Sequence, residues 1–249
     1  MSAIGLGIDT TFDDTSVAIL HGKREILVNL TLSQFQDHKE FGGVVPERAS
    51  RKHLEVIHHL ISRALKEAKK DFSAIDYIAV SNYPGLLGSL LVGLMVAKSL
   101  AYSLKCPLIG VNHVEAHPYA NVLIHGEMIF PILHLIVAGG HTLLIIAKDH
   151  FDYEIIGRSL DDAAGECVDK VAKMFGYPLP GGPVIDKAAQ KFSGDAYYFP
   201  RPLINKKDYN FSFSGLKTAI LRFREKNPDI CPQVGKNPKS LTAEGPILA

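Results

Sequence analysis

Two histidines four residues apart are the first feature of this sequence that suggests chemistry. His113 and His117 follow an apolar run at residues 108–111 that predicts a strand. Side chains four residues apart share a helix face, so both imidazole rings could bind one transition metal. Two solvated histidines on a helix surface would give the same pattern. Glu115 would point to the opposite side of such a helix, which argues against the HExxH protease arrangement.

A glycine turn between two predicted strands is the second candidate. Its glycines would let successive backbone amides converge on a phosphate or carbonyl oxygen. The simpler alternative is a β-hairpin that uses two glycines for their positive φ angles. If the turn binds a ligand, its residues are Ile136, Val137, Ala138, Gly139 and Gly140.

Two further segments, residues 159–170 and 180–187, place acidic residues near predicted helix starts. Asp169 and Asp186 could accept hydrogen bonds from sugar hydroxyls, and Gly182 would allow a ligand to approach the backbone. Acids that only complement a helix dipole would look the same. The spacing does not choose between these two interpretations.

The loop after the first predicted strand carries three carboxylates among threonines. Asp9, Asp13 and Asp14 lie there, and the loop is similar to the first phosphate loop of sugar kinases and actin-like ATPases. Turns rich in Asp and Thr are also common for local structural reasons. We treat the three carboxylates as candidate catalytic residues that could orient a metal-bound water or an incoming amine.

Hydrophobic periodicity predicts the elements that must position these side chains. The predicted strands are residues 4–9, 16–21, 25–32, 77–81, 108–111, 131–138, 142–147 and 153–157. The predicted helices are a long one from Pro46, a buried one from about Gly88, one from near His113, and residues 162–175, 183–192 and 215–226.

The three strands that precede a helix occur twice, which suggests that a βββαβα plan is duplicated. We therefore predict an α/β protein with two lobes, residues 1–128 and 129–226, mixed sheets flanked by helices, and a ligand cleft between the lobes. Residues 227–249 contain four prolines and little periodicity, so we expect an atypical tail there.

Composition narrows the class of protein. The chain has 249 residues, 47% of them hydrophobic, and a net charge of +1, which excludes a disordered chain and gives no global attraction to nucleic acid. Three widely spaced cysteines fit a reducing compartment, so we expect a cytoplasmic protein. The longest apolar stretch, residues 86–102, is interrupted by Gly, Lys and Ser and is short for a bilayer, so we expect no membrane association.

A local basic region is the candidate contact for nucleic acid. Residues 201–226 carry seven Lys or Arg against two acids, a net charge of 7 − 2 = +5. Phosphate contacts need such a patch, although a charged helix face is the commoner explanation for it.

Seven short segments of the sequence, taken together, indicate a protein family. They are residues 9–15 (DTTFDDT), 41–50 (FGGVVPERAS), 84–86 (PGL), 113–117 (HVEAH), 139–142 (GGHT), 161–166 (DDAAGE) and 211–218 (FSFSGLKT). Taken in order, they resemble the TsaD family of tRNA N6-adenosine threonylcarbamoyltransferases. The likeness covers about residues 4–226.

The resemblance implies the two-lobed fold of actin, sugar kinases and the Hsp70 ATPase (the ASKHA fold), with the second lobe incomplete here. It implies transfer of a threonylcarbamoyl group from threonylcarbamoyl-AMP to N6 of the adenosine 3′ of the anticodon, in tRNAs that read ANN codons. Because this carbamoyl donor is already activated, the reaction needs positioning and charge stabilisation and no covalent nucleophile.

Site residues and partners also follow from the resemblance. His113 and His117 would bind one divalent metal, Fe²⁺ or Zn²⁺, while residues 136–140, Asp169, Gly182 and Asp186 would contact the adenylate, and an adenine nucleotide is a further expected ligand. The implied partners are tRNA, a paralogous TsaB-type subunit and a TsaE-type P-loop ATPase. The paralogue would dock on exposed apolar helix faces of the first lobe, including that of the helix from Pro46 to Lys70.

The sequence also departs from the family pattern. Phe12, Tyr83 and Ala138 stand where the family usually has Cys, Gly and Ser. After Lys226 nothing matches the family's later nucleotide-binding Gly-Gly-x-x-x-Asn motif or the aspartate that completes its metal site. A catalytic metal typically has three protein ligands, so we expect this chain to be truncated or frameshifted and impaired as an enzyme. A metal-dependent glycoprotease and a non-catalytic subunit that binds partners are the alternatives.

Overall fold

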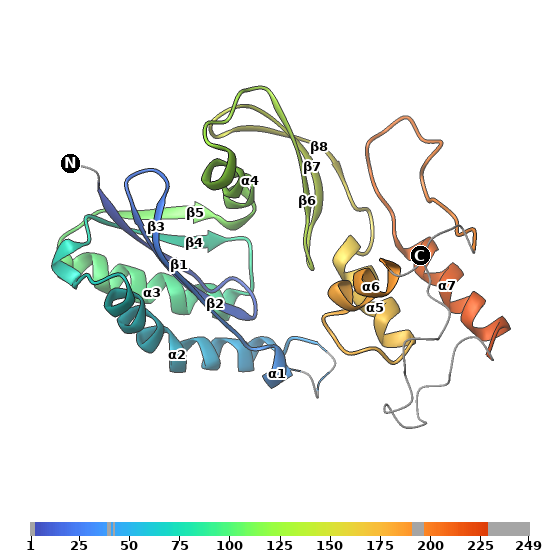
Figure 1. Ribbon diagram of the computed structural model, residues 1–249, viewed down its shortest axis with the longest axis horizontal. Coiled ribbons are helices and arrows are strands. Elements are labelled where there is room, and N and C mark those ends of the chain that lie inside the picture. Colours follow the sequence, from blue (N-terminus) through green and yellow to red (C-terminus); the bar gives the residue numbers. More distant parts are fainter. Residues whose placement is uncertain (1–2, 39–40, 42, 191–196, 229–249) are drawn as a thin grey trace. The chain divides into compact units, whose positions relative to one another are not determined.

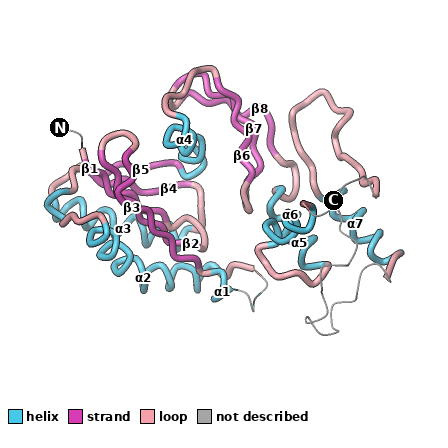
Figure 2. Tube along the Cα trace, in the orientation of Figure 1, coloured by secondary structure: helices cyan, strands magenta, loops and turns pink. Residues whose placement is uncertain are grey.

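The computed structural model describes residues 3–38, 41, 43–190 and 197–228. The chain folds into two compact units, Met1–Met128 and Ile129–Ala249. Unit 1 alternates strands and helices after an opening run of three strands, and unit 2 begins with three strands again (Figure 2). The predicted α/β class, with a mixed sheet flanked by helices, is confirmed.

A five-stranded sheet forms the centre of unit 1. Its order is β3-β2-β1-β4-β5, and β1 pairs antiparallel with β2 but parallel with β4. Ile8 of β1 lies opposite Val17 of β2 and Val80 of β4, so apolar side chains line up across the sheet. The strands are β1 (Ile4–Asp9), β2 (Asp14–His21), β3 (Glu25–Ser33), β4 (Tyr77–Tyr83) and β5 (Leu108–Asn112).

Helices α2 and α3 run side by side along the sheet (Figure 1). The long helix begins at Pro46, a residue suited to a first helical turn, and buries one stripe that includes Ile57, Ile61 and Leu65. These side chains join Leu6, Ile19 and Ile78 of the sheet in one core. The helical elements of unit 1 are α1 (Phe35–His38), α2 (Pro46–Glu67), η2 (Phe72–Ala74), α3 (Leu87–Leu104) and α4 (His113–His125).

The helix α3 is not buried all round, contrary to the expectation from its composition. Ala97 and Ala101 face the core, but Leu87 is 75% exposed and Tyr102 is 87% exposed. Within the described residues, α3 is the one helix whose length and apolar composition would suffice to cross a membrane. The sequence could not predict which face of α3 packs against β4, because α3 is apolar all round and has no polar stripe on its outer side.

Unit 2 contains a three-stranded antiparallel sheet in the order β6-β7-β8. Its helices gather a small core in which Cys167, Val171 and Ile220 are buried. The strands are β6 (Ile132–Val137), β7 (Thr142–Asp149) and β8 (Asp152–Arg158), and the helices are α5 (Ala164–Met174), α6 (Gly181–Ala189) and α7 (Ser214–Lys226). Most of the expected tail, residues 229–249, lies outside the described residues.

Candidate functional site

Asp9 stands at the carboxyl end of β1 and is held by hydrogen bonds from three directions. Its Oδ1 accepts from the backbone N–H of Thr11 (3.0 Å) and from the Thr11 hydroxyl (2.8 Å). Its Oδ2 accepts from the Ser81 hydroxyl on β4 and from Nδ1 of His113 at 2.8 Å. Burial opposes the charge, but the hydrogen bonds from His113, Ser81 and Thr11 outweigh it and hold the pKa of Asp9 well below its usual range.

The paired histidines lie on α4, as predicted. Asn112 caps this helix, because its side-chain oxygen accepts from the N–H groups of Val114 (2.9 Å) and Glu115 (3.4 Å). The rings of His113 and His117 meet edge to face with centroids 4.8 Å apart. The spacing of four has therefore brought both imidazoles to one helix face.

The contact with Asp9 also determines which ring nitrogen of His113 carries the lone pair. An ionised carboxylate only accepts, so Nδ1 of His113 donates, and in the neutral ring Nε2 is the nitrogen left with a lone pair that could bind a metal. Metal-bound histidines are usually oriented by such a carboxylate. These residues fit a divalent metal as two ligands, and the described residues contain no group of three or more His, Cys, Asp or Glu that could hold one.

Glu115 has a structural role. Its Oε1 accepts a hydrogen bond from the Asn112 side-chain amide at 3.2 Å and so holds the residue that caps α4. This agrees with the prediction that Glu115 does not act as a base beside the histidines. Glu115 therefore gives no support to the protease alternative, which needs a general base beside the histidines.

The structure separates the three candidate carboxylates of the first loop. Asp9 contacts His113, whereas Asp14 already belongs to β2 and pairs with Ser33 of β3. The backbone carbonyl of Asp13 accepts from the N–H of Gln34 at 3.1 Å. Burial, and then the negative charge of Asp14, raises the pKa of the Asp13 carboxyl. Sequence spacing did not distinguish the three acids, but within the described part of the chain Asp9 is the one that contacts a histidine of α4.

In unit 2 the glycine turn packs against the start of α5. The N–H of Ala138 donates to the carbonyl of His141 at 2.8 Å and closes the turn. A Cβ on Gly165 would lie 2.8 Å from the Ala138 carbonyl oxygen, so only glycine permits this close approach. Neither Gly139 nor Gly140 has a positive φ, and a Cβ on either would meet nothing within 4 Å.

This geometry removes the simpler explanation of the two glycines. A hairpin that used these glycines for their conformational freedom would place them at positive φ angles, and neither glycine has a positive φ. What remains is open space above the backbone of Gly139 and Gly140, next to the amino-terminal end of α5. Ile136 is buried in the sheet, so it supports the turn from behind.

Asp169 lies on α5, and Gly182 and Asp186 lie on α6, the helix that packs against α5. Oδ1 of Asp169 accepts from the backbone N–H of Gly181 at 2.6 Å and so holds the start of α6. Gly182 faces open space, since a Cβ there would meet nothing within 4 Å. Asp186 lies one turn further along α6 and its Oδ2 accepts from the Gln190 side chain at 2.8 Å.

Helix spacing groups these residues in two pairs, one on each helix. Gly165 and Asp169 are four apart on α5, and Gly182 and Asp186 are four apart on α6, so each pair shares a helix face. Gly165 touches the glycine turn and Asp169 touches α6. We call the set Gly139, Gly140, Asp169, Gly182 and Asp186 the α5–α6 surface.

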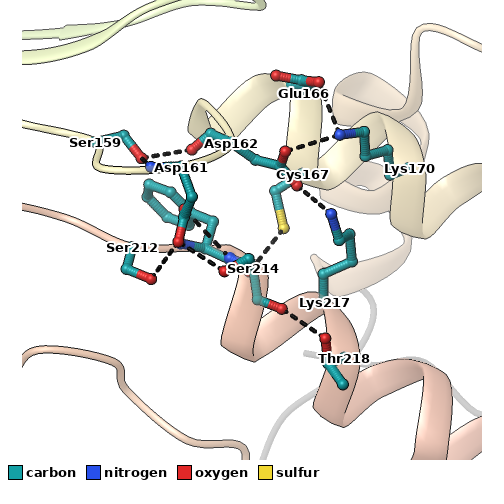
Figure 3. A network of polar contacts seen from close by, with 11 residues as sticks. Ser159, Asp161, Asp162, Glu166, Cys167, Lys170, Ser212, Ser214, Lys217 and Thr218 are labelled. Atoms are coloured by element: carbon teal, nitrogen blue, oxygen red, sulfur yellow. Dashed lines mark hydrogen bonds and ion pairs between the residues drawn. The ribbon is translucent and has the colours of Figure 1, made fainter.

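A polar network that the sequence did not predict joins two distant motifs of unit 2 (Figure 3). Oδ2 of Asp161 accepts from the hydroxyls of Ser212 (2.5 Å) and Ser214 (2.7 Å), and its Oδ1 accepts from the N–H of Phe213 at 2.7 Å. Burial opposes the charge, but these hydrogen bonds outweigh it and hold the pKa of Asp161 below its usual range. About fifty residues separate the partners, and no spacing rule links them across that distance.

Asp162 completes the network with two lysines. It pairs with Lys170 of α5 at 2.8 Å and with Lys217 of α7 (Figure 3). Lys217 was counted in the basic region as a candidate phosphate contact. Its ion pair with a largely buried carboxylate assigns it a structural role, so the patch available to nucleic acid is smaller than the sequence suggested.

The amino-acid sequence matches a known protein family over most of its length. The family model for TsaD, described as tRNA N6-adenosine threonylcarbamoyltransferase, matches residues 25–243. The protein of that name from Carboxydothermus hydrogenoformans is 49% identical over 229 residues, which are 92% of this chain and 68% of the relative. The one from Bacillus subtilis is 47% identical over 232 residues, 92% of this chain and 66% of the relative. The chain therefore spans about two thirds of the length of these curated relatives.

Solved structures give only a distant likeness. The activator of 2-hydroxyisocaproyl-CoA dehydratase from Clostridium difficile is 13% identical, with a TM-score of 0.48 over 94% of this chain and 69% of that chain. The ethanolamine utilization protein EutJ from Carboxydothermus hydrogenoformans is also 13% identical, with a TM-score of 0.44 over 90% of this chain and 82% of that chain.

Proposed function

The chain belongs to the TsaD family of tRNA N6-adenosine threonylcarbamoyltransferases, and we propose that its two units carry the metal-binding and the adenylate-binding parts of that enzyme. The reaction is transfer of a threonylcarbamoyl group from threonylcarbamoyl-AMP to N6 of the adenosine 3′ of the anticodon, in tRNAs that read ANN codons. The observation that carries the proposal is the contact of Asp9 with His113, beside a second imidazole on the same helix face.

In unit 1, His113 and His117 are the proposed ligands of Fe²⁺ or Zn²⁺. Asp9 holds the Nδ1 proton of His113 and directs Nε2 toward the ion, while Thr11 and Ser81 hold Asp9. A bound ion would act as a Lewis acid on substrate oxygens. Asp9 is thus a positioning residue in this proposal, in place of the catalytic role suggested by its loop.

In unit 2, the α5–α6 surface is the proposed adenylate-binding surface. The open backbone at Gly139, Gly140 and Gly182 would admit a ligand close to the main chain, where N–H groups can bind anionic oxygens. Asp186 is exposed, so its carboxylate can accept from ribose hydroxyls. One oxygen of Asp169 already accepts from Gly181, which leaves its second oxygen for a ligand.

The metal-binding part is tested by titrating the full chain with Co²⁺ and following its absorption. We expect binding by the wild type and loss of binding in H113A/H117A. The control is H58A/H59A, which removes an exposed pair of neighbouring histidines from α2. Equal binding by H113A/H117A and the wild type would refute the proposed ligands.

The adenylate-binding part is tested by calorimetric titration with AMP and with threonylcarbamoyl-AMP. We expect D186A to weaken binding by about tenfold, because a hydrogen bond to a charged group contributes about 1.5 kcal/mol or more. The control is E225A, which removes an exposed carboxylate from α7. Unchanged affinity in D186A would remove Asp186 from the surface.

Transfer itself is tested with labelled threonylcarbamoyl-AMP, the proposed TsaB-type and TsaE-type partners and two tRNAs. One tRNA has the adenosine 3′ of the anticodon and the other has guanosine there. We expect label on the first only, at a rate below that of the longer Bacillus subtilis relative, because the described residues supply two metal ligands. Metal-dependent cleavage of a glycoprotein without any transfer would favour the protease alternative.

The exposed side of α3 is the proposed docking face for the TsaB-type subunit. Leu87, Leu91 and Met95 recur every four residues along it and all are exposed. Such a contiguous apolar stripe commonly marks a protein interface. We expect L91E/M95E to abolish co-purification with that subunit, whereas Y198E, which alters an exposed aromatic residue of unit 2, should leave it unchanged.

A further inference from the structure

His53 is buried where α2 faces the first loop, although the sequence offered no reason to single it out. Its side chain is fully buried. Nε2 lies 3.1 Å from the carbonyl oxygen of Phe12, and Nδ1 lies 2.8 Å from the Thr15 hydroxyl and 3.2 Å from Nε2 of Gln34. Gln34 is itself fully buried and precedes α1.

The partners of His53 fix its protonation state. The Phe12 carbonyl only accepts, so Nε2 of His53 must donate. The amide nitrogen of Gln34 also contacts the Ala49 carbonyl at 3.3 Å, so it is a donor and Nδ1 of His53 must accept. His53 is therefore a neutral ring with its proton on Nε2, and burial lowers its pKa in agreement with this state.

The chain of donors extends beyond His53 to the start of α2. The N–H of Val45 donates to Nδ1 of His38 at 3.4 Å, and Nε2 of His38 donates to the side-chain oxygen of Gln34 at 3.1 Å. Every hydrogen bond in this series points the same way and ends on the Phe12 carbonyl. A buried network in which each group is satisfied specifies one arrangement.

The carbonyl that receives this chain belongs to the loop that holds Asp9. Thr11, one residue before Phe12, donates twice to Asp9, and Asp9 accepts from His113. The α3 start holds the same loop, because the N–H of Leu86 donates to the Thr11 carbonyl at 2.8 Å and the Ser89 hydroxyl donates to the Phe12 carbonyl at 3.3 Å. The Asp9–His113 contact thus depends on a loop clamped by two helices.

We propose that His53 is a positioning residue for the metal-binding histidines, because its Nε2–H fixes the Phe12 carbonyl and with it the loop that orients Asp9 and His113. This inference rests on the proposed function of His113 and His117. It assigns to α2 a role in the geometry of the site as well as in the core. The path runs through His53, Phe12, Thr11 and Asp9 to His113.

Two substitutions separate the two hydrogen-bonding functions of the ring. In H53Q the amide nitrogen can still reach the Phe12 carbonyl, whereas in H53N the shorter amide keeps an acceptor near Thr15 and loses that reach. The control is H59Q, which changes an exposed histidine of the same helix. Binding of Co²⁺ is measured on the full chain at a temperature where circular dichroism shows each variant to be folded.

We expect H53N to weaken Co²⁺ binding by about tenfold and H53Q and H59Q to stay within about threefold, since outer partners of metal-bound histidines contribute about tenfold or more. A purely structural His53 would lower the unfolding temperature of both His53 variants and leave the Co²⁺ affinity of the folded chain unchanged. That result would overturn the inference.

A second readout does not depend on metal binding. The ring-nitrogen chemical shifts of His113 report whether Nδ1 still carries the proton directed at Asp9. We expect them to change in H53N and to match the wild type in H53Q and H59Q. If the wild type binds no Co²⁺, the proposed metal site fails, and the His113 shifts alone decide the role of His53. Identical shifts in H53N and the wild type would refute it.

Discussion

At the scale of single residues, Asp9 and Asp13 have the same side chain but different pKa values and contacts, because their surroundings differ. The side chain of Asp9 is 28% exposed and is charged because donors converge on it from β4, α4 and its own loop. Asp13 is four residues away, and burial, followed by the negative charge of Asp14, raises its pKa. The hydrogen-bond partners, and not the residue type, decide which carboxylate orients the histidines.

The role of Asp9 predicts the effect of replacing it. We expect D9N to weaken Zn²⁺ binding at His113 and His117 by about 10- to 100-fold, because the neutral amide binds the Nδ1 proton of His113 less strongly than the carboxylate does. A competition titration with a chromogenic chelator measures the affinity. The control is E55Q, an exposed carboxylate on α2. Unchanged affinity in D9N would show that the carboxylate does not tune the site.

His134 on β6 is a buried imidazole of another kind. Within the described part of the chain, its Nε2 meets no hydrogen-bond partner, and it faces the core side of the sheet opposite Ile145. Burial lowers its pKa in the folded state. The unfolded chain therefore takes up a proton first as the pH falls below about 6.5, and stability is lost from there down toward the folded-state pKa.

We expect H134L to raise the free energy of unfolding of unit 2 by about 1 kcal/mol at neutral pH, because it removes an unsatisfied buried polar group. The gain over the wild type should be larger at about pH 5.5 than at about pH 7.5, since the leucine takes up no proton. Urea unfolding at the two pH values measures both effects. H125L, at an exposed position of α4, is the control. A gain that does not depend on pH would contradict the argument.

At the scale of elements, the start of α7 is capped from a distance. Phe213 precedes α7 and provides no side-chain cap, and Asp161 takes over this function by accepting from the N–H groups of Phe213 and Ser214. The same stretch pairs Ser159 with Phe211 in a parallel bridge. The α5 and α7 helices are thereby joined at their amino-terminal ends as well as through the small core.

We expect D161A to lower the free energy of unfolding by about 1 kcal/mol, as for the loss of a helix cap. Because the folded-state pKa of Asp161 lies below its unfolded value, this contribution is present at neutral pH and is lost as the pH falls below about 4. Hydrogen exchange should accelerate at Phe213 and Ser214, and E225A should leave both unchanged. Wild-type exchange at these amides in D161A would show that another group caps the helix.

At the scale of the whole molecule, the two units differ in how much core each contains. In unit 1, helices α2 and α3 and one face of the sheet share one extensive cluster that includes Leu6, Ile57 and Ile78. Among the described residues of unit 2, the helices bury Cys167, Val171 and Ile220 in a smaller cluster, and the outward side of β6 leaves Leu133 and Leu135 exposed. Apolar burial is the dominant favourable contribution to stability, so the units should differ in stability.

We expect a fragment of residues 1–128 to unfold cooperatively on its own, and a fragment of residues 129–228 to unfold at lower temperature. Thermal melts followed by circular dichroism compare the two directly. The core of unit 1 lies entirely within its own residues, which is the physical reason for its independence. A fragment 1–128 without a cooperative transition would show that unit 1 needs the rest of the chain.

The sequence by itself determined most of the local structure. The periodicity predicted β1 at its observed bounds and the start of α2 at Pro46, and it placed the other strands within a few residues, because side-chain burial repeats along each element. It also placed His113 and His117 on one helix face, since that depends only on helix geometry. The family followed from the order of short motifs.

Only the tertiary structure decided which residues meet. The partner of His113 lies 104 positions away at Asp9, and the partners of Asp161 lie about fifty positions away at the start of α7. Neither His53 nor Ser81 stood out in the sequence, because a buried hydrogen bond between distant segments leaves no periodic signal. Local patterns record how each segment packs, whereas contacts such as Asp9 to His113 arise only when the strands and helices that carry them have been brought together.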